Sequence, residues 1–74
     1  MKGHERKAIL RALEPATKQV RAEYQREILS PKMLRHIALR TVTIAQLRAG
    51  RLYDNVTADK ARTYAYHKAC ELIH

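Results

Sequence analysis

The sequence predicts an all-α fold, a small single-domain bundle of three to four helices. Apolar residues recur at intervals of three and four along most of the chain, which is the periodicity of a helix with one buried face. No pair of segments has the pattern of neighbouring strands, and an isolated strand is not stable in water. We expect helices at about residues 5–13, 15–29, 31–49 and 57–73, within one domain of residues 1–74 that has a short basic N-terminal arm at residues 1–4.

The N-terminal segment keeps one helical phase although Pro15 interrupts it. A proline inside a helix removes a backbone hydrogen bond and costs about 3 kcal/mol, whereas the first position of a helix accepts it readily. One kinked helix and two successive helices therefore both fit the pattern. We expect a break or a sharp kink at Glu14–Pro15, with both pieces facing the same core. The apolar positions are Ile9, Leu13, Ala16, Val20, Tyr24 and Ile28.

The segment from Ser30 to Gly50 is expected to form the central helix. Ser30 is a favoured N-cap, Pro31 suits the first helical position, and Gly50 accepts the left-handed conformation that ends many helices. Apolar residues cover more than half of the circumference, so this helix should have neighbours on several sides. The apolar line is Met33, Ile37, Ile44 and Leu47, widened by Leu34, Ala38, Val42 and Ala45.

Residues 40–44 conflict locally with this helix. The segment is rich in β-branched residues, which favour strands, and Arg40 falls inside the apolar stripe. Arg40 could pair with a glutamate from another helix or lie at an interface, or the helix could break there. A continuous helix is favoured, because a lone strand would have no partner in this chain.

Residues 51–56 are expected to form a loop, with turn chemistry at Asp54 and Asn55. Thr57 is the expected N-cap of the last helix, and Asp59 suits its first turn. Small side chains on one line would allow close packing against the central helix; they are Ala58, Ala61, Ala65 and Ala69, followed by Leu72. The same helix would carry outward Lys60, Arg62, Thr63, His67 and Lys68.

Positive charge dominates the composition, with 15 Lys and Arg against 7 Asp and Glu and a net charge of +8. In a small domain such an excess attracts phosphate backbones or an acidic protein surface. A core of this size supplies only about 3–5 kcal/mol, so partner binding or a homodimer is a reasonable expectation. A solvated helix face is the alternative to a binding face. The candidate contacts to nucleic acid or another partner are Lys7, Arg11, Lys18 and Arg21, extended by Lys32 and Arg35.

Other chemistries find less support. A helix-turn-helix has a turn of three or four residues, whereas seven residues separate Ala49 from Thr57. Enzymatic activity is not expected, because the chain has no Gly-rich phosphate loop and no paired carboxylates in an apolar pocket. No cofactor is expected. No metal is expected either, since no second ligand cluster accompanies the one helical sector formed by His67, Cys70, Glu71 and His74.

The sequence also bears on location. A single cysteine, Cys70, fits a reducing compartment. Neither a signal-peptide run nor a segment of membrane-spanning length is present, so we expect a cytoplasmic protein without a membrane partner.

The leading functional hypothesis is a small basic non-enzymatic regulator of transcription that binds the backbone of duplex nucleic acid. The alternative is a phage-like protein-interaction module that docks on an acidic surface of a large assembly, such as RNA polymerase or a nuclease, and modulates it. In size and charge the chain is similar to small regulators of phages and mobile elements, and no motif identifies a family. The charge excess supports both hypotheses equally.

Overall fold

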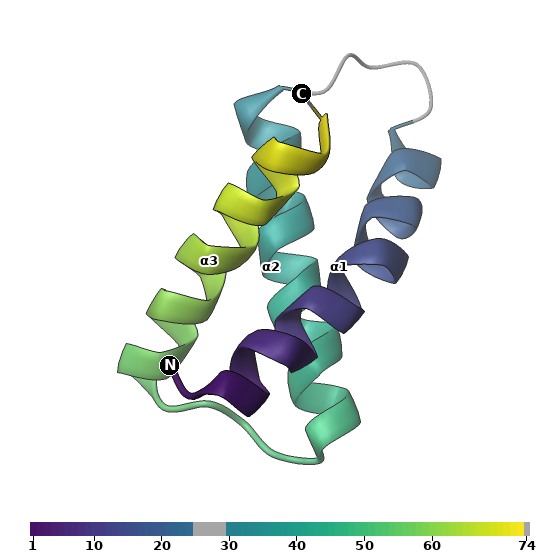
Figure 1. Ribbon diagram of the computed structural model, residues 1–74. Coiled ribbons are helices and arrows are strands. Elements are labelled where there is room, and N and C mark those ends of the chain that lie inside the picture. The colour runs from purple at the N-terminus through teal and green to yellow at the C-terminus, as the bar shows by residue number, and fades with distance from the viewer. Residues whose placement is uncertain (25–29, 74) are drawn as a thin grey trace.

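A computed structural model describes residues 1–24 and 30–73 of the chain, which form α1 (Gly3–Glu23), α2 (Pro31–Ala49) and α3 (Asn55–Ile73). The helices lie side by side, and consecutive helices run in opposite directions (Figure 1). α2 packs against both neighbours, while α1 and α3 contact each other less extensively. The expected all-α bundle is confirmed for the described residues, with α2 as its central helix.

Of the two alternatives at Pro15, a break into two helices is wrong, because α1 continues through this residue as one helix from Gly3 to Glu23, and a kink within this helix stays a prediction. The predicted segment 5–13 and the described part of 15–29 are therefore one element. Residues 25–29, and with them the predicted core residue Ile28, lie outside the described part of the chain. Continuity of the buried face outweighs the cost of the proline, as the unbroken apolar phase on both sides of Pro15 shows.

The start of α1 also differs from the expectation. Gly3 and His4 belong to the helix rather than to an arm. Glu5 explains the earlier start, because its Oε1 accepts a hydrogen bond from the backbone N–H of Lys2 at 2.8 Å. This bond satisfies a donor at the helix entrance, where the first N–H groups have no partner within the helix.

The predicted bounds of the central helix are confirmed. The Ser30 hydroxyl accepts from the Met33 N–H at 3.3 Å, and Pro31 is the first helical residue. Gly50 ends the helix with φ of 70° and ψ of 24°. A side chain at this position would be strained by the left-handed backbone, which glycine adopts freely.

Residues 40–44 are helical throughout, as favoured from the sequence. The hydroxyls of two β-branched residues donate to the carbonyl one turn earlier, Thr41 to Ile37 at 2.7 Å and Thr43 to Leu39 at 3.0 Å. Thr41 is completely buried, so this local bond is what satisfies its hydroxyl. The threonines thus fit the helix without leaving a buried polar group unpaired.

Arg40 forms the ion pair that the sequence allowed for. Its guanidinium binds Glu23 of α1 with both nitrogens, Nη1 to Oε1 at 2.9 Å and Nη2 to Oε2 at 3.1 Å. Nη1 also donates to Oε1 of Gln19 at 3.1 Å. Arg40 therefore lies at the edge of the α1–α2 contact, half-buried, and ties the end of α1 to the middle of α2.

The expected N-cap at Thr57 is wrong, because α3 begins at Asn55 and Asp54 takes that role. Oδ1 of Asp54 accepts from the Thr57 N–H at 2.7 Å, which is the N3 donor of a helix capped at residue 54. The connection shortens accordingly to residues 50–54. Gln46 holds this connection to α2, since its Oε1 accepts from the Tyr53 N–H at 2.8 Å.

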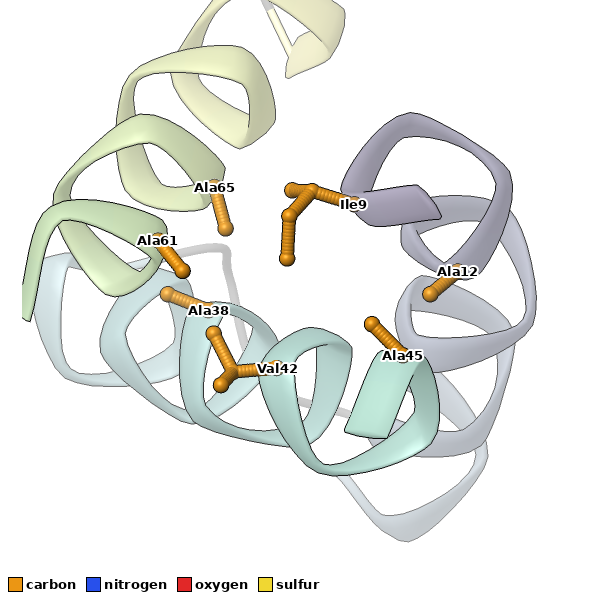
Figure 2. Close-up of a cluster of buried hydrophobic side chains, with 7 residues drawn as sticks. All are labelled: Ile9, Ala12, Ala38, Val42, Ala45, Ala61 and Ala65. Carbon is orange, nitrogen blue, oxygen red and sulfur yellow. The ribbon is translucent and has the colours of Figure 1, made fainter. Parts of the chain in front are cut away.

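The core is built largely from alanines. Figure 2 shows one of its two clusters, in which alanines from all three helices surround Ile9 and Val42. The second cluster holds the larger side chains, namely Leu13, Val20, Met33, Leu34 and Ile37, with Ala69. Small side chains permit close helix packing but bury little apolar area each, so the two clusters together form a modest core.

The central apolar line is partly wrong. Met33 and Ile37 are buried, but Ile44 is half-buried and Leu47 is 76% exposed. The buried stripe instead advances in steps of four residues, through Thr41 and on to residue 45. Each such step turns about 40° beyond a full circle, so the stripe crosses the helix obliquely, as expected for helices that pack at an angle.

Candidate nucleic-acid interface

Four of the predicted contact residues share one exposed face of α1. We call this surface the outer face of α1; its residues are Lys7, Arg11, Lys18 and Arg21, all exposed. At about 100° per residue they fall opposite the buried residues Ile9, Ala16 and Val20. From Lys7 to Arg21 the row extends about 21 Å along the helix axis, at about 1.5 Å per residue. The predicted common face is therefore a basic row, interrupted by Glu14.

Two of the acidic residues of α1 turn away from this face. Glu5 is buried and faces Lys2 and Arg51, whose Nη2 lies 3.8 Å from Oε2. Glu23 is held by Arg40 of α2. The backbone hydrogen bond from Lys2 lowers the pKa of Glu5, and the hydrogen bond from Arg40 lowers the pKa of Glu23. Both carboxylates are thus committed to contacts away from the basic row.

Glu14 is the remaining carboxylate of α1 in the described residues, and it lies within the row. Its Oε1 is 3.1 Å from Nζ of Lys18 one turn later. Both side chains are about three-quarters exposed, and exposed pairs of this kind contribute only about 0–1 kcal/mol. A phosphate can therefore compete for Lys18 at small cost, and four cations against one carboxylate leave the face strongly positive.

A groove of about 710 Å³ lies beside the outer face, between the start of α1 and α3. We call it the α1–α3 groove. Its lining comes from both ends of the sequence: Met1, Arg6, Asp59, Lys60, Thr63, Tyr64 and His67. Arg6 precedes Lys7 by one residue and points about 100° around the helix from it, toward α3. The groove is thus a lateral extension of the outer face.

The charge of the α1–α3 groove is also positive. Asp59 forms an ion pair with Arg62, which reduces the negative charge it presents to the groove. Arg6 and Lys60 form no ion pair with any residue of segments 1–24 and 30–73. The ring of Tyr64 lies on the groove wall, with Nζ of Lys68 5.6 Å from its centroid. The cationic groups of this groove are suited to contacts with a phosphodiester backbone.

The other two predicted contacts belong to α2. Lys32 is exposed in the first turn of α2. Arg35 lines a different groove, between α2 and α3. It lies about 140° around α2 from Arg40, which contacts α1. Arg35 therefore does not extend the row on α1 as the sequence suggested.

Sequence reasoning missed Arg6 and did not connect Lys60 and His67 with α1. The outward positions of Lys60 and His67 on the last helix follow from periodicity, but their proximity to Arg6 depends on how α3 packs on α1. The sequence does indicate that Arg6 is a cation on the flank of the helix, between the buried Glu5 and the exposed Lys7. Such flank positions border the grooves of a bundle.

The structure also bears on a helix-turn-helix and on a metal site. The five-residue connection between α2 and α3 is still longer than the three or four residues of a helix-turn-helix. Among the described residues no group of three or more His, Cys, Asp or Glu side chains is placed to hold a metal ion, and His74 lies outside them.

Comparisons of the chain with protein-family models, curated proteins and solved structures found no match. Within the described residues, every helix is too short or too polar to cross a membrane. Functional inference therefore depends on the surface itself: a basic row on α1 and the basic groove that adjoins it.

Proposed function

We propose that the protein is a small non-enzymatic regulator that binds the backbone of duplex nucleic acid, with transcription as the process regulated. The binding surface comprises the outer face of α1 and the α1–α3 groove. The observation that carries the proposal is the groove, because it joins Arg6 to Lys60 and His67 of α3 directly beside the row on α1. Regulation follows from occupancy of the duplex and needs no catalytic group.

The dimensions of the row support this partner. Successive phosphates of one strand lie about 3.4 Å apart along B-DNA, so a row of about 21 Å spans about six of them. Because each strand winds around the duplex axis, four cations spread over that length would contact those phosphates of the two strands that face the protein. Phosphate contacts of this kind fix position on the duplex and carry no sequence information by themselves.

The distribution of acidic groups supports it as well. Glu5 and Glu23 are engaged with Arg51 and Arg40, away from the row. Asp59 is paired with Arg62 at the groove margin. Glu14 within the row and Asp59 in the groove are each paired with a cation, so the surface keeps an excess of positive charge. The free cysteine Cys70 is consistent with action in the cytoplasm.

The test is an anisotropy titration of a labelled duplex of about 20 base pairs, roughly three times the expected footprint. Arg6→Gln/Lys60→Gln removes two cations from the α1–α3 groove, and Lys32→Gln/Arg35→Gln removes the same charge from elsewhere. We expect the groove variant to lose about two units of salt slope and the control to keep the parental slope. Equal losses in both variants would show that net charge, not this surface, drives binding.

The same titration addresses the docking alternative. A protein partner with an acidic surface gives salt-sensitive association but retains packing contacts at high salt. If duplex DNA and RNA fail to bind at low salt, where attraction is strongest, the proposal is wrong and the basic row serves an acidic protein surface or solubility.

A further inference from the structure

A second groove lies between α2 and α3 and shares Thr63 with the α1–α3 groove. We call it the α2–α3 groove. It has a volume of about 460 Å³ and is lined by Arg35, Ala38 and Leu39 of α2 and by Arg62, Thr63 and Tyr66 of α3. Leu39 is 51% exposed although it lies in the middle of the central helix. An exposed leucine inside a concave surface is unlike one isolated on a convex face, since it offers a site for another apolar group.

The two walls of this groove follow the same pattern. Arg35 stands one turn before Leu39 on α2, and Arg62 stands one turn before Tyr66 on α3. Because the two helices are antiparallel (Figure 1), the order from arginine to apolar side chain runs in opposite directions along the two walls. Ala38 keeps the floor shallow and buried, in the cluster with Ala61 and Ala65 that Figure 2 shows. The groove thus combines apolar side chains with one arginine on each wall.

Both arginines are available to a ligand. Arg35 is exposed and forms no ion pair with any residue in the described part of the chain. Arg62 pairs with Asp59 on its own helix, and that carboxylate is 78% exposed. A surface pair of this kind is weak, so a carboxylate from a ligand can replace Asp59 with little loss.

We propose that the α2–α3 groove binds an acidic amphipathic helical segment of a partner protein. An apolar side chain of the segment would sit on Leu39 and Tyr66, and carboxylates on either side of it would meet Arg35 and Arg62. A helix that lays its apolar face in a groove is a recurrent mode of peptide recognition. Arg35 and Arg62 lie outside the surface assigned to nucleic acid, although Thr63 lines both grooves, so the protein would bring a duplex and a protein partner together.

Two other occupants fit less well. A phosphate backbone would gain two arginine contacts but would also bury charged oxygens against Leu39 and Ala38, which is unfavourable. A second copy related by a two-fold axis would place Arg35 and Arg62 of one chain against the same arginines of the other. Like charges in such an interface repel each other, whereas an acidic segment is complementary in charge to both arginines.

The test uses synthetic peptides of about 16 residues, long enough for partial helicity. The first has leucines at helical spacing flanked by glutamates; in the second, glutamine replaces each glutamate; in the third, serine replaces each leucine. We expect the first to bind with a Kd of about 10–100 μM, and the other two about tenfold more weakly. Amide shifts of the full chain should change around residues 35–39 and 62–66. No binding of the first peptide at about 1 mM would overturn the proposal.

Matched variants locate the site. Leu39→Ser should weaken the first peptide about tenfold, and Leu47→Ser, at a more exposed leucine of the same helix, should leave its affinity unchanged. Arg35→Glu/Arg62→Glu should reverse the preference, so that a peptide with lysine in place of glutamate binds better. Equal effects of the two leucine variants, displacement of the peptide by duplex DNA, or loss of binding through self-association in sedimentation would each contradict this assignment.

Discussion

Arg48 of α2 donates a hydrogen bond from Nη1 to the backbone carbonyl of Arg11 in α1, at 3.4 Å. In a regular helix this carbonyl would accept from the N–H of residue 15, and Pro15 has none. The side chain of a neighbouring helix thus reaches the acceptor that the proline leaves unpaired. This contact, together with the continuous buried face, accounts for a helix that passes through an interior proline.

Replacing Pro15 tests this relationship. Pro15→Ala restores the missing N–H and should stabilise the protein by about 2 kcal/mol. An interior proline costs about 3 kcal/mol, but it also reduces the conformational entropy of the unfolded chain, which stabilises the folded protein by about 1 kcal/mol. Arg48→Ala should cost about 0.5 kcal/mol in the parent and nothing in the Pro15→Ala background, because its acceptor is then paired. Urea unfolding of the parent, the two single variants and the double variant measures both effects. An equal cost of Arg48→Ala in both backgrounds would refute the link.

The core assignment predicts opposite outcomes for two apolar residues of α2. Ile37 is completely buried, so Ile37→Val should cost about 0.5–1.5 kcal/mol and Ile37→Ala about 2–5 kcal/mol. The alanine variant approaches the whole stability of so small a domain, which is why the valine variant is measured beside it. Leu47→Ala should change the free energy of unfolding by less than about 0.5 kcal/mol. A larger cost at Leu47 than at Ile37 in thermal unfolding would contradict the packing of α2.

The cap at Asp54 predicts a pH dependence of stability. The backbone hydrogen bond from Thr57 lowers the pKa of Asp54 below its ordinary value of 3.8. A lowered folded-state pKa means that the cap contributes fully above the unfolded-state pKa and that this contribution is lost as pH falls through the folded-state pKa. Stability should therefore decrease in acid partly through this residue.

Two substitutions separate capping from titration at this site. Asparagine caps helices about as well as aspartate but does not titrate, so Asp54→Asn should keep the neutral-pH Tm and flatten the acid decline. Asp54→Ala should lower the Tm at neutral pH, because the Thr57 N–H loses its acceptor. Thermal melts between neutral and acid pH provide the comparison. Identical melts for Asp54→Ala and the parent would place the cap elsewhere.

The sequence predicts best those features that depend on local chemistry. Ser30, Pro31 and Gly50 act within a few residues of themselves, and they define both ends of α2 correctly. The predicted cap of α3 is wrong by three residues. Asp54 and Thr57 are both favoured N-cap residues, and the structure uses Asp54. Periodicity likewise places the exposed cations of α1 on one face.

Features that depend on packing between helices were not predictable in the same way. The continuity of α1 through Pro15 depends on a hydrogen bond from Arg48, which lies 33 positions later in the sequence. The assembly of Arg6 with Lys60 requires the rotation of α3 about its own axis, which the alanine-rich faces set only when they meet. For the same reason the position of Arg35 beside α3 could not be predicted, because a charge on the outside of a helix can border either neighbour.

The most direct measurement of the proposed function is the salt dependence of duplex binding by the unmodified protein. Four to six phosphate contacts predict a slope of log K against log salt of about −4 to −5, at about −0.9 per contact. Converting Lys7, Arg11, Lys18 and Arg21 together to glutamine should flatten the slope, weaken all sequences alike and leave the fold intact. A slope near zero, or one that the four substitutions leave unchanged, would contradict a backbone-binding role for the outer face of α1.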